Sequence, residues 1–473
     1  MKILIQFCGC LSLSILLLCT SCEKFLGVNP DNRVRPTLTS DYQAIITGAY
    51  PGAEHFFTEL YTDNYRYYNF TSYDNASVVT WFLPIYLWSD EYVPNGVSPD
   101  ATWRNYYNYI YKANVVLEQV DGSEGDEKLK RSIKGEAHLI RAYCHFMLAN
   151  IFAKHYHPAN SSSDLGVPIV TAAEKDNNTI YKRNTVQEVY DFVEEEIFKG
   201  LELIDESTYK VPKHHFTTVS VYAFLSRFYL FKSNWEESLK YSNKVFDINY
   251  SIRDVFTDFD MYFPTSQFGQ FSYNYFSVGK PNVLLMNYSL EWMSYFRSGF
   301  YGTEVRAAYA ADDIRARLFT YNNATYRNWN MAKYKSVLSD NGNRYSDVPL
   351  FVLEEVIFNA AEANIKKQNP DFETATRLVN DVIGKRYRNT TIPYLNMSDY
   401  AGAEELFNAV LIEKNKELCF EGIRWFDIKR LNIPIKHHDG NKYVDLPADD
   451  LRRVVQIPLS ERNANPDIIP NPR

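Results

Sequence analysis

Apolar side chains recur at helical spacing along most of this chain. Between Ile133 and Ile151 they follow one another at steps of four, three, four, three and four residues, which places them on one face of a long helix. Residues 103–117 show the same period, and a polar segment at residues 122–126 separates the two stretches. The pattern therefore predicts two helices joined into an αα-hairpin of about 50 residues.

Amphipathic segments and short polar breaks continue to alternate beyond this hairpin. Residues 185–204 and 217–232 predict two helices, and a third begins at Asn234. Residues 350–367 and 372–388 predict another pair around an Asn-Pro-Asp turn. Such helix pairs, with Trp or Phe entering the second helix, resemble tetratricopeptide units, although no strict period of about 34 residues is present. We therefore predict a mainly α fold, built on a degenerate scaffold of tetratricopeptide-like helix pairs.

Two long regions lack this period. Residues 50–100 and 254–343 are rich in aromatic and polar side chains, without a sustained repeat of apolar positions. Loops of such length are uncommon in compact domains unless they carry function. We predict that these two portions form a ligand surface on a helical scaffold that spans roughly residues 36–250 and 350–430.

The N-terminus has the pattern of a lipoprotein signal. Lys2 precedes an apolar run at residues 3–18, which is too short and too interrupted to span a bilayer and is typical of a cleaved export segment. Cys22 follows Thr-Ser, whereas Cys19 stands where lipoproteins usually carry Leu. We predict a signal peptide at residues 1–21 and lipidation of Cys22, with a soluble secreted product as the alternative.

Composition narrows the range of functions. The chain has 473 residues, and removal of the signal leaves 49 basic against 58 acidic side chains, a formal charge of −9, so a nucleic-acid partner is not indicated. Once Cys22 carries lipid, only Cys144 and Cys419 can pair, so a disulfide framework does not hold the fold. Aromatic residues make up 16% of the chain, and those in non-periodic polar segments are the candidates for ligand contact.

The sequence near the C-terminus carries the most specific pattern. Residues 411–430 read Leu-Ile-Glu-Lys-Asn-Lys-Glu-Leu-Cys-Phe-Glu-Gly-Ile-Arg-Trp-Phe-Asp-Ile-Lys-Arg. This segment closely resembles the hallmark of the SusD/RagB family of Bacteroidetes outer-membrane nutrient-binding lipoproteins. Further segments match in the order of that family: Trp103 to Asn114, Gly135-Glu136-Ala137, Arg141-Ala142-Tyr143, Gly166-Val167-Pro168, Arg183-Asn184-Thr185-Val186 and Ala360-Ala361-Glu362-Ala363.

The resemblance covers nearly all of residues 22–473, which we therefore expect to form a single SusD-like unit. It implies a helix-pair scaffold with a large irregular, loop-rich portion. It also implies a lipid-anchored protein of the outer membrane, facing the cell exterior, that captures nutrients for a SusC-type TonB-dependent transporter. The resemblance implies that the cargo is a glycan, with a peptide as the alternative.

The residues of the hallmark have a structural interpretation of their own. Glu413, Glu417, Phe420 and Arg424 stand at steps of four, three and four residues, which predicts one helix face on which the carboxylates and the arginine form an ion network. A catalytic carboxylate pair is the alternative interpretation.

The sequence motifs that could indicate catalysis or metal binding are weak. The chain has no Gly-rich phosphate loop, no His-Glu-x-x-His helix and no Gly-x-Ser-x-Gly elbow. His138, His145 and the pairs at 214–215 and 437–438 lack Cys or carboxylate companions at metal spacing, so we interpret them as packing or surface residues. Acidic pairs at 312–313 and 449–450 are common in any acidic chain and indicate a glycosidase only weakly. We predict a protein that is not an enzyme and has no cofactor, although calcium at the site stays open.

Sugar binding needs an aromatic ring over the apolar face of a pyranose, and polar side chains that bond its hydroxyls. Both irregular regions offer this mixture. The predicted ligand-binding residues are Asp63, Asn64, Arg66, Tyr67, Trp81, Trp88 and Tyr92 in the first region, and Trp292, Tyr295, Phe296, Arg306 and Trp329 in the second. Trp88 and Trp292 have an alternative role as plugs that pack loops onto helices. A glycoside hydrolase and a repeat adaptor without a small-ligand pocket are the remaining alternatives.

Overall fold

The structure is a computed structural model, and it describes eleven stretches of the chain: residues 36–67, 76–174, 179–257, 276–290, 300–301, 303–321, 329–331, 333, 337–338, 344–387 and 391–473. The predicted signal and Cys22 lie outside the described residues, as do Trp292, Tyr295 and Phe296. Within the described stretches, no helix is both long enough and apolar enough to cross a membrane.

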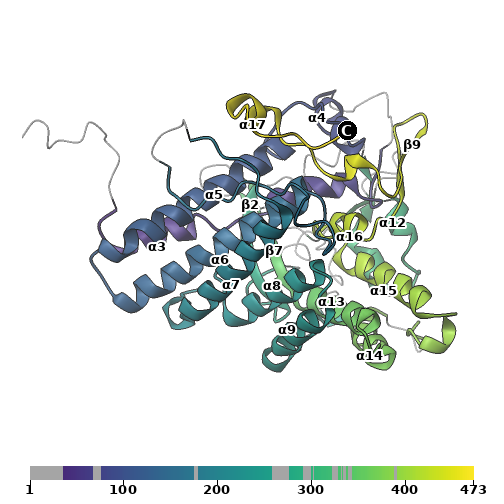
Figure 1. Cartoon of the computed structure of the whole chain (residues 1–473). Coiled ribbons are helices and arrows are strands. Elements are labelled where there is room, and N and C mark those ends of the chain that lie inside the picture. Colours follow the sequence, from purple (N-terminus) through teal and green to yellow (C-terminus); the bar gives the residue numbers. More distant parts are fainter. Residues whose placement is uncertain are drawn as a thin grey trace, which may run out of the picture.

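The scaffold consists of helices packed side by side largely in chain order. Helix α5 packs on α6, α6 on α7, α8 on α9, and α9 on α13, which in turn contacts α14 and α15, so that the array runs across the molecule (Figure 1). The αα-hairpin predicted around residues 122–126 is confirmed. The helices are α3 (Thr39–Thr47), α5 (Pro99–Gln119), α6 (Glu127–Phe152), α7 (Val186–Leu203), α8 (Thr218–Phe231), α9 (Trp235–Ile248), α13 (Leu353–Lys366), α14 (Phe372–Ile383) and α15 (Ala403–Leu418).

Side-chain caps explain where several of these helices begin. The Asp126 carboxylate accepts a hydrogen bond from the backbone N–H of Leu129 at the start of α6. Thr185 and Glu188 form a reciprocal capping box at the start of α7, and Asn234 caps α9. Such caps satisfy backbone donors that a helix leaves unpaired, so these starts can be predicted from local sequence.

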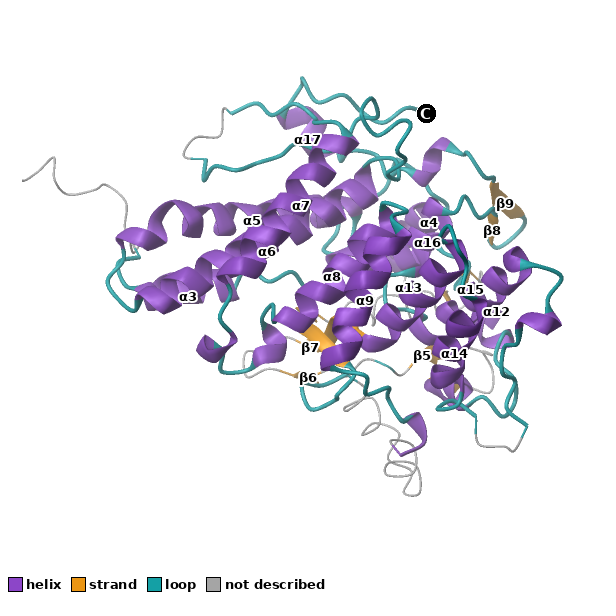
Figure 2. Cartoon of the chain, turned by 60° about the horizontal axis from the view of Figure 1, so that its bottom comes forward, coloured by secondary structure: helices purple, strands orange, loops and turns teal. Residues whose placement is uncertain are grey.

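The second irregular region contains strands that its sequence pattern did not reveal. Strand β2 (Val283–Leu290) pairs antiparallel with β7 (Arg344–Val352), and β7 also pairs with β6 (Val337–Leu338). The sheet lies against α8 (Figure 2). Phe351 of β7 packs there against Phe224, with the ring centroids 5.7 Å apart. The small sheet therefore shares the apolar core of the helices.

The first irregular region is also partly helical. It forms the 3₁₀ helix η1 (Glu54–Tyr61), whose residues from His55 onward are all buried, and α4 (Ala76–Tyr86). More than two consecutive turns with no exposed face carry no amphipathic period, which is why the pattern of polar and apolar positions did not indicate η1.

The prediction that Glu413, Glu417, Phe420 and Arg424 share one helix face is wrong, because the hallmark forms two helices. Helix α15 ends at Leu418, and a separate helix α16 (Arg424–Arg430) begins after a sharp turn. Phe420 and Gly422 have φ values of 63° and 76° in this turn. At Gly422 a Cβ atom would lie 2.6 Å from the rings of His55 and Phe56, so the close approach of η1 requires glycine.

The break changes the partners of the hallmark carboxylates. The Glu417 carboxylate accepts two hydrogen bonds from Arg386, of 2.8 and 2.7 Å, and one from Arg315. Arg315 also bonds Asp313 and Glu413. Burial alone would raise the pKa of Glu417, but the two guanidinium groups outweigh burial and hold that pKa well below its ordinary value. The predicted ion network exists, but its arginines come from outside the hallmark and Arg424 is not a member.

Candidate functional site

The two irregular regions of the sequence meet in space. Strand β1 (Arg66–Tyr67) pairs antiparallel with β3 (Phe300–Tyr301), with Arg66 opposite Tyr301. Strand β1 also contacts β8 (Ile435–His438), which forms a hairpin with β9 (Tyr443–Leu446). We call this meeting of β1, β3, the β8–β9 hairpin and the start of α16 the junction. The junction joins the portions that the sequence predicted to share a ligand surface.

An ion pair links the first region to the hallmark at the junction. Arg424 at the start of α16 donates two hydrogen bonds to the carboxylate of Asp63, of 2.9 and 2.8 Å. Burial would lower the pKa of Arg424, but the bonds to Asp63 outweigh burial and raise it. The pair is 361 positions apart in the chain, and the Asp63 side chain keeps 37% of its surface exposed. Such a pair offers a flat set of donors and acceptors at the surface.

A cavity of about 390 Å³ opens beside this ion pair. Asn415 of α15 lines it, and its Nδ2 donates to Asn64, while its Oδ1 is buried and finds no hydrogen-bond partner in the described part of the chain. A buried acceptor without a partner costs free energy unless a ligand or water satisfies it. The cavity is lined by Asp63, Val305, Ala308, Asn408, Leu411, Ile412, Asn415, Lys416, Arg424 and Ile433.

Asn64 and Tyr67 lie beneath this surface rather than on it. Asn64 is fully buried, and its Nδ2 donates to the Glu59 carboxylate at 3.2 Å. Tyr67 is 3% exposed. These two predicted residues hold β1 in position.

One exposed ring at the junction was missed at the sequence level. Tyr443 on β9 is 49% exposed, and the guanidinium of Arg66 lies over it, 5.7 Å from the ring centroid. The ammonium group of Lys436 approaches the same ring to 4.7 Å. Tyr443 stands in a polar hairpin with Asp, Gly, Asn and Lys, so the criterion of an aromatic residue in a non-periodic polar segment also applies to it.

Trp88 has the packing role that the sequence left open. Its side chain is 3% exposed, its Nε1 donates to the carbonyl of Tyr61 at 3.2 Å, and its ring stacks on His437 with centroids 4.0 Å apart. The other face of the imidazole stacks on Tyr86 at the same distance. The prediction that His437 is a packing residue is confirmed.

The remaining predicted residues are more scattered. Trp81 on α4 and Tyr92 are both partly buried against the core, and Tyr92 lies beside Asp100 at the start of α5. Arg306 is on α12 (Thr303–Ala307), the helix that contributes Val305 to the cavity. The backbone of Trp329 belongs to β5 (Trp329–Met331), which pairs with β4 (Phe319–Tyr321).

The acidic pairs do not resemble a hydrolase site. Asp313 is buried, and burial would raise its pKa, but Arg315 holds that pKa below its ordinary value. The carboxylate of Asp450 bonds Arg452, which lowers its pKa. A general acid needs a raised pKa. Burial raises the pKa of Glu59 and of Glu421 to about 7, but both carboxyls are enclosed in the core. The described residues contain no group of three or more His, Cys, Asp or Glu placed to hold a metal ion.

Comparison with known families gives matches along most of the chain. Residues 24–230 match a SusD-like family described as "Starch-binding associating with outer membrane", and residues 258–472 match the SusD family. The SusD-like protein P38 of Formosa agariphila is 23% identical over 509 residues, covering 92% of each chain. The SusD-like protein P2 of the same organism is 30% identical over 144 residues, or 29% of this chain and 28% of its own.

Solved structures have the same fold. A SusD superfamily protein from Bacteroides thetaiotaomicron superposes with a TM-score of 0.69 at 21% identity, covering 92% of this chain and 100% of its own. A protein from Bacteroides vulgatus, described as a putative sugar binding protein, gives a TM-score of 0.71 at 22% identity over 93% and 99%. At these identities the likeness shows the fold, and the mainly α prediction is confirmed.

Proposed function

This chain belongs to the SusD/RagB family, and we propose that it is a lipoprotein of the outer-membrane surface that binds a glycan without altering it chemically. Membership of this family supports two general properties, carbohydrate binding and association with the outer membrane. In our proposal, acylated Cys22 tethers the protein, and a SusC-type TonB-dependent transporter receives the oligosaccharide or polysaccharide that it captures.

The observation that carries the proposal is the junction. Pairing of β1 with β3 unites the two irregular regions beside the hallmark, and the Asp63–Arg424 pair lines a cavity. Carboxylate, guanidinium and amide groups bond sugar hydroxyls in defined planes, and the Tyr443 ring offers an apolar surface nearby. Tethering beside a transporter raises the local concentration of cargo, so modest affinity for each sugar unit suffices.

The predicted residues divide into two roles in this proposal. We assign ligand contact to Asp63, Arg66, Trp81 and Arg306, and add Tyr443, Asn415 and Arg424. Asn64, Tyr67 and Trp88 support the surface from below. The second irregular region reaches the junction through β3, and its other proposed contacts are Trp292, Tyr295, Phe296 and Trp329. Tyr92 is proposed as a contact at the start of α5.

Affinity electrophoresis tests the proposal. The purified protein is run through native gels that contain soluble starch, levan, laminarin or galactomannan, and calorimetry with a mixture of short peptides tests the alternative cargo. We expect one polysaccharide to retard the wild type and Tyr443→Ala to weaken that retention roughly ten-fold, the effect of losing about 1.4 kcal/mol.

Tyr394→Ala is the matched control, because Tyr394 is 44% exposed and lies in the loop after α14. Its retention should equal that of the wild type. Binding of peptides without any polysaccharide would replace the glycan by a peptide as the cargo. Release of shorter sugars from the retained polysaccharide, lost in Asp63→Asn, would show a hydrolase.

A further inference from the structure

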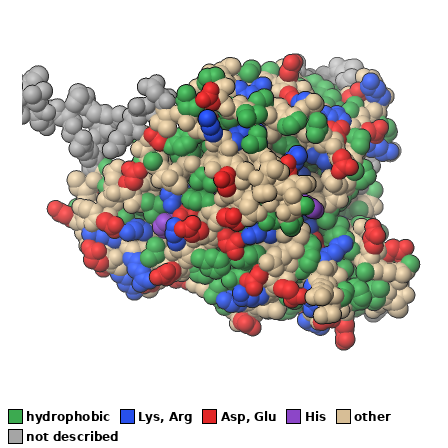
Figure 3. Space-filling view, in the orientation of Figure 1, with side chains coloured by type: hydrophobic (Ala, Val, Ile, Leu, Met, Phe, Trp, Pro, Cys, Tyr) green, Lys and Arg blue, Asp and Glu red, His purple; other side chains and the backbone are tan. Residues whose placement is uncertain are grey.

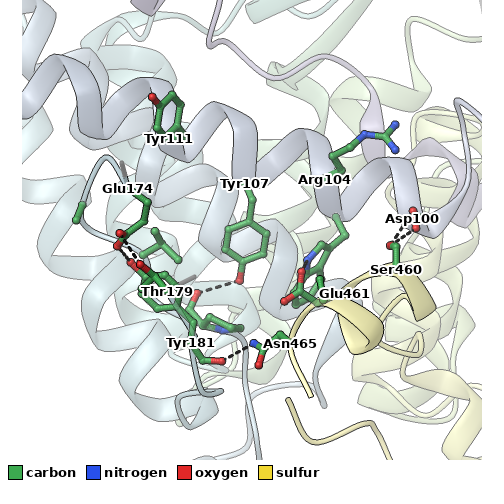
Figure 4. Close-up of a pocket in the computed structure, with 15 residues that line it drawn as sticks. Asp100, Arg104, Tyr107, Tyr111, Glu174, Thr179, Tyr181, Ser460, Glu461 and Asn465 are labelled. Carbon is green, nitrogen blue, oxygen red and sulfur yellow. Dashed lines mark hydrogen bonds between the residues drawn. The ribbon is translucent and has the colours of Figure 1, made fainter. Parts of the chain in front are cut away.

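A second hollow, of about 540 Å³, lies along α5, away from the junction cavity with which it shares no residue. Its walls are α5, residues 168–174 and 179–181, and the short helix α17 (Leu459–Ala464) near the C-terminus (Figure 4). The volume falls in the range of about 300–1,000 Å³ that is typical of small-molecule sites.

Three aromatic residues of α5 line this hollow at four-residue steps. Trp103, Tyr107 and Tyr111 therefore lie along one side of the helix, with a rise of about 6 Å from each to the next. The rings of Trp103 and Tyr107 are 4.9 Å apart between centroids, and Tyr111 is 43% exposed. Trp103 is only 5% exposed, so Tyr107 and Tyr111 are the rings of this row that can face a ligand.

Hydrogen bonds hold the opposite wall to α5. Tyr107 donates its hydroxyl to the carbonyl of Pro168 at 2.9 Å (Figure 4). Asn114 Nδ2 donates to the carbonyls of Val170 and Ala172, at 3.2 and 3.0 Å. The hollow is thus preformed, so binding would not have to order this wall.

The floor carries an acceptor without a donor. Asn465 is 7% exposed, and its Nδ2 donates to the carbonyl of Tyr181 at 2.8 Å, which fixes the orientation of the amide. The other end of the amide, Oδ1, is buried and has no hydrogen-bond partner among the residues that the structure describes. Because an unpaired buried acceptor is costly, this atom points to a ligand that brings an O–H or N–H group.

The charges of the lining narrow the ligand class. The lining carries three carboxylates, those of Asp100, Glu174 and Glu461, and one guanidinium, that of Arg104. This excess of negative charge disfavours an acidic or sulfated ligand. Each carboxylate already accepts from a neutral donor: Asp100 from Ser460, Glu174 from Tyr181, and Glu461 from the indole of Trp103. Arg104 is exposed and makes no hydrogen bond or ion pair with a described residue, so its guanidinium can donate to a ligand.

We propose that this hollow is a second saccharide site, which binds a short stretch of a neutral oligosaccharide against the rings of Tyr107 and Tyr111. Hydroxyl groups of the sugar would donate to Asn465 Oδ1 and accept from Arg104. The saccharide class rests on the proposed function, whereas the position of the site rests on the geometry of α5 and α17. Exposed Ile180 and Leu459 adjoin the lining, and hydrophobic side chains are visible at the upper edge of the molecule, where α17 lies (Figure 3).

The test uses the full mature protein in native gels containing soluble starch, levan, laminarin or galactomannan. Tyr111→Ala and Arg104→Ala remove exposed side chains, so the fold should survive, which circular dichroism checks. We expect either substitution to weaken retention by the polysaccharide that binds the wild type about five- to ten-fold. Tyr394→Ala, equally exposed, should change nothing, and Tyr111→Ala combined with Tyr443→Ala should weaken retention more than either alone.

Each outcome separates this site from the junction. Retention lost in Tyr443→Ala but unchanged in Tyr111→Ala and Arg104→Ala would overturn the second site and leave the proposed function standing. A wild type that no polysaccharide retards would overturn both. Calorimetric binding of an oligolysine peptide that Tyr111→Ala abolishes would overturn the saccharide assignment in favour of a basic peptide.

Discussion

The helix array and the junction are held together by different interactions. In the array, from α5 to α9, neighbours in sequence pack mainly through apolar faces, as where Ile140 and Ile197 are fully buried, although Arg141 and Glu196 also form a buried ion pair between α6 and α7. At the junction and the adjoining hallmark, the contacts are buried ion pairs between distant residues, such as Glu417 with Arg315 and Arg386. Apolar packing tolerates exchanges that conserve volume, whereas a buried charge depends on one specific partner. The two regions should therefore respond differently to small chemical changes.

The largest expected effect comes from Glu417→Gln. The substitution keeps the shape of the side chain but leaves Arg386 and Arg315 short of negative charge inside the core. We expect a loss of about 3–5 kcal/mol in the free energy of unfolding, measured by urea denaturation. Arg377→Met, which removes an exposed ion pair with Asp381, should cost less than about 1 kcal/mol. Similar losses in the two variants would mean that the buried network does not hold the hallmark.

The next largest effect is expected at the turn between α15 and α16. Gly422→Ala places a Cβ in a left-handed backbone conformation and 2.6 Å from His55 and Phe56, so we expect a loss of about 2 kcal/mol or more. Gly402→Ala is the control, because Gly402 is extended and has no atom within 4 Å of the added methyl group. Equal melting temperatures of the two variants would contradict the close approach of η1 to this turn.

The third prediction concerns pH. Burial raises the pKa of Glu59 to about 7, above the ordinary 4.5 of the unfolded chain, so between these pH values the folded state binds the additional proton. The stability that this carboxyl contributes is therefore fully present below pH 4.5 and is lost as the pH rises through about 7. Between these pH values the free energy of unfolding should fall with pH, with a slope that approaches about 1.4 kcal/mol per pH unit for one proton.

Urea denaturation between pH 5 and 8 measures this slope. Glu59→Gln should flatten it, whereas Glu236→Gln, at an exposed position of α9, should leave it as in the wild type. An unchanged slope in Glu59→Gln would assign the pH dependence to other groups. Glu421 is the first of these, because burial raises its pKa to about 7 as well.

The smallest effect is expected in the helix array. Ile197→Val on α7 removes one methylene group from a fully buried side chain, which should cost about 0.5–1.5 kcal/mol by thermal or urea denaturation. The comparison of the two regions predicts that this change costs less than Glu417→Gln although both conserve the general shape of the side chain. A larger loss at Ile197 would reverse that comparison.

The sequence predicted the helix array better than the candidate site. The starts of the helices depend on contacts between residues that are close in the chain, whereas the site depends on contacts between residues that are far apart in it. Asn234 and Thr185 mark helix starts through bonds to residues three positions away. By contrast, the exposure of Trp88 depends on His437, which arrives from β8, and the role of Asp63 depends on Arg424. No local pattern at residue 63 or 88 carries this information. Tyr443 was missed although its polar surroundings fit the criterion that selected the other aromatic residues.

By itself the sequence determined the helix pairs, the family and the parts of the chain that depart from helical periodicity, because these depend on local spacing and on a contiguous motif. The tertiary structure decided which of these parts meet, that the hallmark bends at Phe420, and which aromatic side chains remain exposed. The reason is physical: burial and the pairing of charges are properties of contacts between distant segments, and they arise only when η1, the hallmark and the β8–β9 hairpin pack together.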